Sequence, residues 1–175
     1  MRATSNKRPE LSKVLRDLFA KFEDLLARGA PFSALTRLGE IKLLLGKLPA
    51  HEKAEWRERI SGPRFAGLAW NERSEIKEII ARIRRLTESD RDLQFDEYCL
   101  LLSLRFKVMC AVVYLTRENE EALNEDALKT IDAFLLEMVT DDAKRQKMAR
   151  AAAFISKNLG TRFEPSELLP VGWAH

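Results

Sequence analysis

Histidine is scarce in this sequence, and that scarcity excludes most of the chemistry that enzymes build on imidazole. Only His51 and His175 occur. His51 begins the segment HEKAEW, which lacks the second histidine of the zinc-binding pattern HExxH, so a zinc ion would be short of a ligand. The patterns GxxxxGKS/T, GxGxxG and GxSxG are also missing. We therefore predict a protein without catalytic residues, metal or cofactor, which is not an enzyme.

Cysteine is scarce too, with two residues, and the two are not placed to pair with each other. Cys99 and Cys110 lie on one predicted helix, separated by about 16 Å along its axis. Free thiols are typical of a reducing compartment. The first residues, MRATSNKRPELSK, contain no apolar core of the kind that a secretory signal needs. We therefore predict an intracellular, cytoplasmic protein, with the nucleus as the other location that fits.

Strands and repeat arrays have little support in the sequence. No stretch alternates apolar and polar residues, and no pattern recurs with a period of about 20–50 residues. Glycine and proline are few, at 7 and 6 residues, so long helices meet few interruptions. A chain of 175 residues buries about 70% of its unfolded surface without help from a metal or disulfide. We predict an all-α, single-domain bundle of six or seven helices around a central apolar helix at about 97–115.

The prediction divides the chain into three regions. Residues 1–8 form a flexible basic N-terminus, and residues 161–175 form an extended tail that packs on the domain or on a partner. The helical domain covers 9–160, with amphipathic helices outside the central one at 9–28, 33–48, 51–60, 72–86, 125–139 and 140–159. Ser33 and Asn124 are expected N-caps, and Gly29 and Gly160 are expected to end helices. Gly39, inside a helix, indicates that two helices pack closely there.

The central helix is the most apolar part of the chain. Apolar side chains would cover most of a helix at Tyr98–Leu115, which is typical of a bundle centre or a membrane span. Arg105 and Lys107 lie in its middle, and a span tolerates almost no charge, so the bundle centre is favoured. Asp96 is the expected N-cap, with Phe95 before it as part of a hydrophobic staple. A narrow polar stripe is expected to reach solvent: Ser103, Lys107, Cys110 and Tyr114.

Arg105 does not lie on that stripe. Its guanidinium stays charged, so burial requires a carboxylate or several carbonyl groups as partners. An ion pair with an acid on a neighbouring helix is the first expectation. A ligand contact inside the bundle, or a side chain that reaches past its neighbours to water, is the alternative.

Large apolar residues outside the helices point to the first function. They gather in the segment SGPRFAGLAW at 61–70 and in the tail, where they either complete the core or contact a partner. We predict a non-catalytic helical protein–protein interaction module, that is, an adaptor, subunit or regulatory factor, with self-association included. Its predicted interface residues are Phe65, Leu68, Trp70, Leu168, Leu169 and Trp173.

A nucleic-acid-binding helical protein is the alternative function. The net charge is +3, from 30 basic and 27 acidic residues, which permits contact with phosphates without requiring it. Acids are interleaved almost everywhere, so an ordinary solvated surface is the other explanation of the basic residues. The basic clusters that would contact phosphates are Arg82, Arg84, Arg85, Lys144, Arg145, Lys147 and Arg150.

Overall fold

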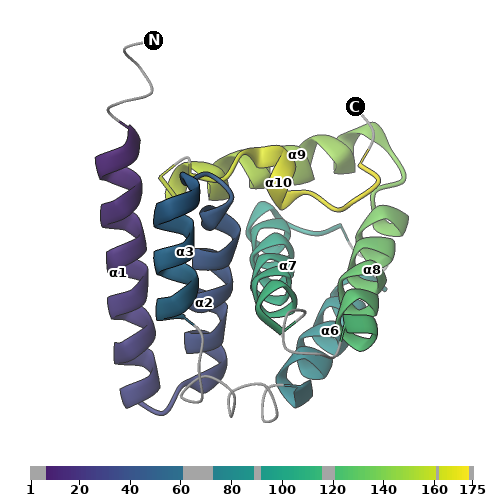
Figure 1. The fold of residues 1–175 in the computed structure, drawn as a ribbon. Helices are drawn as coiled ribbons and strands as arrows, with labels where there is room; N and C mark the ends of the chain where they lie inside the picture. Colours follow the sequence, from purple (N-terminus) through teal and green to yellow (C-terminus); the bar gives the residue numbers. More distant parts are fainter. Residues whose placement is uncertain (1–6, 61–72, 89–91, 116–120, 161, 174–175) are drawn as a thin grey trace. The chain divides into compact units, whose positions relative to one another are not determined.

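A computed structural model of the chain describes residues 7–60, 73–88, 92–115, 121–160 and 162–173 (Figure 1). Eight helices and no strand occur in these residues, so the all-α class is confirmed. The seven predicted helices are all present, and an eighth lies in the tail. The helices are α1 (Lys7–Ala27), α2 (Pro31–Leu45), α3 (Ala50–Arg59), α6 (Arg73–Thr87), α7 (Phe95–Leu115), α8 (Glu121–Met138), α9 (Asp142–Asn158) and α10 (Pro165–Leu168).

The end of α1 follows from one glycine, as the sequence predicts. Gly29 has φ +75°, a left-handed conformation that a side chain disfavours. Its N–H donates to the Leu26 carbonyl at 3.2 Å, and the Ala30 N–H donates to the Leu25 carbonyl at 2.9 Å. This pair of bonds is the Schellman motif, which satisfies the last carbonyls of a helix and turns the chain away. Gly160, with φ +66°, follows α9 in the same way.

Three predicted N-caps were wrong, because each helix begins earlier than its best capping residue. Pro31 begins α2, since proline lacks the N–H that a first turn leaves unpaired, and Ser33 therefore lies inside the helix. α7 begins at Phe95, and Asp96 belongs to its first turn. α8 begins at Glu121, so Asn124 also lies within a helix.

Internal contacts divide the chain into two compact units, while the prediction of one domain over 9–160 stays a prediction. Unit 1 contains α1, α2, α3 and the last turns of α7, from Cys110 onward. In this unit α1 and α2 lie side by side and run antiparallel (Figure 1). A Cβ on Gly39 of α2 would overlap the backbone carbonyl of Cys110, so the predicted close packing of two helices at this glycine is confirmed.

The polar stripe predicted on α7 does not reach solvent along its whole length. Cys110 is 1% exposed and Tyr114 is 2% exposed. The Tyr114 hydroxyl lies 3.4 Å from the carbonyl of Ile60, to which it donates. The Lys42 ammonium donates to the Tyr114 carbonyl at 3.0 Å and lies 4.8 Å from the centre of its ring. Neighbours within unit 1 therefore satisfy polar groups that the sequence assigned to water.

Unit 2 contains α6 from Ser74, the first part of α7 to Met109, α8 from Ala122, α9 and α10. α9 turns Met148, Ala151 and Ala152 inward, and the two small alanines allow a close approach of its neighbours. Larger side chains complete the buried interior of this unit, namely Ile83, Leu101, Leu102, Ile131, Leu135, Phe163 and Leu168.

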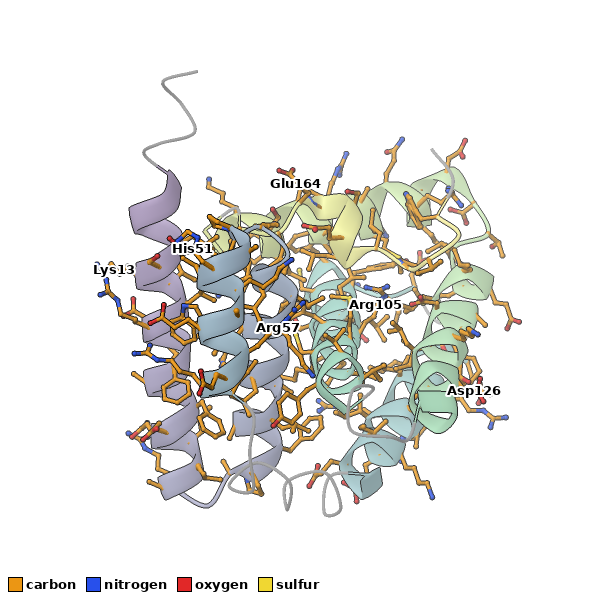
Figure 2. All side chains as sticks on the ribbon, viewed as in Figure 1. Lys13, His51, Arg57, Arg105, Asp126 and Glu164 are labelled. Carbon is orange, nitrogen blue, oxygen red and sulfur yellow. The ribbon has the colours of Figure 1, made fainter. Side chains whose placement is uncertain are left out.

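A buried ion pair lies at the centre of unit 2. Arg105 Nε donates to Asp132 Oδ1 at 2.7 Å, and the two side chains are 2% and 6% exposed. Figure 2 shows Arg105 extending from α7 toward α8. Arg105 Nη1 also donates to the carbonyls of Glu167 and Leu168, at 3.4 and 3.3 Å. The expectation of an ion pair with an acid on a neighbouring helix is confirmed, and the carbonyl partners expected of a buried arginine are present as well.

The same ion pair holds the tail, which is partly helical where an extended path was expected. Asp132 Oδ2 accepts a hydrogen bond from the Val171 N–H at 3.0 Å. α10 begins with Pro165, and Glu164 and Glu167 at its start form reciprocal side-chain to backbone bonds, a capping box. We call the set Arg105, Asp132 and the backbone of 167–171 the tail latch. It fixes the tail against the helices of unit 2.

Candidate interaction surface

The predicted interface residues are not brought together by the described structure. Phe65, Leu68 and Trp70 lie outside the described residues. Leu168 and Leu169 are 1% and 8% exposed, because α10 folds back on unit 2 and turns them inward. These two leucines therefore hold the tail against unit 2 and leave little exposed surface of their own.

Trp173 is half-buried, and the guanidinium of Arg145 lies over its ring. The guanidinium of Arg145 lies 4.3 Å from the centre of the Trp173 ring, a cation–π contact within unit 2. Val171, two residues earlier, is 74% exposed. An interface role for Trp173 stays a prediction.

The basic residues predicted for phosphate contact lie on two helices of unit 2. Arg82, Arg84 and Arg85 are exposed on the last turns of α6. Arg84 Nε donates to Glu88 at 2.7 Å, and this bond raises the pKa of the Arg84 guanidinium. Part of the positive charge on α6 is therefore already neutralised by an intramolecular acid.

The basic residues of α9 differ in exposure. Lys144, Arg145 and Lys147 are half-buried, whereas Arg150 is exposed. The backbone N–H of Lys144 donates to the Asp141 side chain at 2.8 Å, which caps the helix. Asp142, in the first turn, is the one acid within α9, so the rest of this helix carries an excess of positive charge.

Three large apolar residues are exposed among the described residues, and two of them are phenylalanines in contact with each other. Phe95, at the start of α7, and Phe154, in α9, have ring centroids 5.7 Å apart and planes inclined by 74°. This edge-to-face geometry is favourable for aromatic pairs. Phe95 is 39% exposed and Phe154 is 49% exposed. We call these two residues the aromatic pair.

The local structure explains why Phe154 faces outward. The inward positions of its helix are taken by Met148, Ala151 and Ala152. Phe154 instead lies on the same face as Lys147, Arg150 and Lys157, with spacing i, i+3, i+7 and i+10 from Lys147. We call this set the basic face. Within the described residues, no ion pair joins any of its three cations to a carboxylate.

The C-terminal end of α9 is held firmly. Ser156 Oγ donates to the Phe163 carbonyl at 2.6 Å, across the turn that Gly160 makes. The Phe163 ring packs edge-to-face on Phe106 of α7, with centroids 5.1 Å apart. Phe154 is therefore presented by a helix whose opposite face is anchored in the core of unit 2.

The helical position of Phe154 is a signal in the sequence that hydropathy alone does not reveal. Phe154 directly follows three alanines in the sequence, so hydropathy alone groups it with apolar residues, and Phe95 is predicted to form part of a hydrophobic staple. A helical wheel places Phe154 far from Met148 and Ala152, at the border of the inward face, on the side that carries the cations. That Phe95 contacts it depends on how α7 and α9 pack, which periodicity does not encode.

The first turns of α7 carry acidic groups and a thiol that are close to Phe95 in the sequence. Asp96 is exposed and follows Phe95 directly. Burial, followed by the charge of Asp96, raises the pKa of the Cys99 thiol. Burial also raises the pKa of Tyr98, as do the charges of Asp92 and Asp141. These shifts keep Cys99 and Tyr98 protonated near neutral pH.

Across the described ranges, no three His, Cys, Asp or Glu residues gather in a way that could hold a metal ion. No helix there is long and apolar enough to cross a membrane. No family model matches the sequence, and no curated protein or solved structure matches it either.

Proposed function

We propose that this chain is a non-catalytic helical protein–protein interaction module, and that its interface is centred on the aromatic pair. The observation that carries the proposal is the exposure of Phe95 and Phe154, 39% and 49%, on well-anchored helices. Burial of the rest of each ring against a partner would contribute about 1 kcal/mol per ring. Aromatic residues are also enriched among those that dominate binding energy at interfaces.

Rigidity of the surface supports the proposal further. Phe154 stands on α9, whose inward residues Met148, Ala151 and Ala152 are buried. The Ser156–Phe163 hydrogen bond fixes the last turn of the same helix. A partner would therefore meet an aromatic surface already in place, and little conformational entropy would be lost on binding.

Site-specific photo-crosslinking tests this proposal. A benzoylphenylalanine at position 154, in protein expressed in its native cells, should give discrete adducts on denaturing gels and mass spectrometry. The same probe at Glu137, an exposed position on α8 of the same unit, is the matched control and should give none. Light scattering of the purified chain distinguishes a second copy from a different protein. Equal labelling at 137 and 154, or no adduct at 154, would refute the proposal.

Nucleic-acid binding stays the second candidate, because one observation favours it. Arg82 and Arg85 are exposed on α6, and the basic face of α9 is free of carboxylates in the described residues. Phosphate contacts release counterions, so affinity for a single-stranded oligonucleotide should fall steeply as salt increases. Lack of binding at low salt would remove this candidate.

A further inference from the structure

The basic face of α9 surrounds one member of the aromatic pair. Lys147 lies seven positions before Phe154, Arg150 lies four before it and Lys157 lies three after it. These spacings place all three cations on the same side of the helix as the ring. Asp142, the one acid of α9, is about 18 Å from Phe154 along the helix axis. An exposed aromatic ring is thus flanked on its own helix by positive charge alone.

We infer that the partner of this surface is an acidic protein segment, with an apolar side chain or recess that covers Phe154 and carboxylates that pair with Lys147, Arg150 and Lys157. This inference rests on the proposed function and names the chemistry of the partner. Charge complementarity carries it, since the described residues supply no carboxylate to these three cations. Carboxylates on the partner would pair with them on binding and would accelerate encounter.

The other member of the aromatic pair distinguishes a protein from a nucleic acid or an anionic membrane. Phe95 is followed by Asp96, which is exposed, and Asp92 is exposed shortly before it. A polyanion lying over both rings would bring its phosphates close to these carboxylates, which is unfavourable. A protein segment places its acids only beside α9.

Selection from a random peptide library tests the inference. The full chain is the bait, and enriched peptides are then measured by fluorescence anisotropy against the wild type and three variants. These are F154S, the triple reversal K147E/R150E/K157E, and K129E, a matched reversal at an exposed lysine of α8 in the same unit. A labelled oligothymidylate 20-mer is measured in parallel. Circular dichroism and urea midpoints verify that each variant is folded.

The expected result is a set of net-acidic peptides with a large apolar residue. Their affinity should fall at least tenfold with F154S and with the triple reversal, remain unchanged with K129E, and weaken as salt rises. Neutral peptides whose affinity falls with F154S but not with the triple reversal would show that the partner is not acidic. The interaction surface at Phe154 would still be supported. Enriched peptides that are indifferent to F154S would overturn both. Tighter binding of the oligonucleotide that is lost with the triple reversal would replace the protein partner by a nucleic acid.

Discussion

Removal of the Arg105 guanidinium is expected to lower the free energy of unfolding strongly. Arg105 is 2% exposed and donates to Asp132 and to the carbonyls of Glu167 and Leu168. R105M would fill much of the volume but leave a buried carboxylate without its cation. Breaking a buried pair from one side costs about 3–5 kcal/mol. With a urea dependence of roughly 2 kcal/mol per M, the unfolding midpoint should fall by about 2 M.

The double variant R105M/D132L separates the cost of an unpaired charge from the cost of lost packing. Replacing both members of a buried pair with apolar residues is often close to neutral, so the double variant should recover most of the loss. R84M, which breaks the exposed Arg84–Glu88 pair, is the matched control and should leave the midpoint almost unchanged. The assay is urea unfolding followed by circular dichroism.

A tail readout accompanies the stability measurement. Because Arg105 and Asp132 bond the backbone at 167, 168 and 171, R105M should loosen the tail. Trypsin should then cleave after Arg162 faster than in the wild type, under conditions where the rest of the chain is folded. A loss of less than about 1 kcal/mol with R105M would contradict the tail latch. So would a double variant that loses as much as the sum of the R105M and D132L single variants, which are measured alongside it.

Three further predictions follow from burial and close contact. G39A should lower the free energy of unfolding by about 1–3 kcal/mol, because its methyl group would overlap a backbone carbonyl of α7. G46A, at an exposed position with φ −59°, should stabilise the protein slightly. Equal effects of the two variants on urea unfolding would contradict the close packing at Gly39. F154S should leave thermal unfolding nearly unchanged, while F163A, at a buried ring, should cost about 3–5 kcal/mol; a large loss with F154S would mean that the exposed ring supports the core. Cys99 should react with iodoacetamide at pH 8 more slowly than free cysteine, because its raised pKa leaves less thiolate, and rates that match the free amino acid would contradict that shift.

Much of the fold was predictable because its signals are local. Apolar residues with helical spacing placed the helices, and Gly29 marked the end of α1 through its own backbone conformation. Arg105 was predictable for another reason, since a charge on an apolar helix requires a partner wherever it is buried. The sequence left the identity of that partner open, because Asp132 and the carbonyls of 167–168 are distant along the chain.

The interaction surface was not predictable from the same signals. Leu168 and Leu169 occur in a tail without a helical repeat of apolar residues, where apolar residues complete a core or contact a partner with equal ease. Here both leucines are buried. Phe154 looks like a core residue in a hydropathy profile, but its helix turns a different face inward. Its contact with Phe95 depends on tertiary packing alone. Periodicity gives the faces of one helix, and only the fold determines which face a neighbour covers.

The tail latch also sets an order of events during synthesis of the chain. Arg105 pairs with a carbonyl that lies 63 positions later, and Asp132 accepts from an amide 39 positions later. The residues of unit 1, by contrast, are all translated by position 121. When the ribosome has made everything through α9, the guanidinium of Arg105 still lacks its carbonyl partners. Those donors therefore remain without these partners until residues 167 and 168 fold back on α7, so the tail latch closes only after α6, α7, α8 and α9 have all been made.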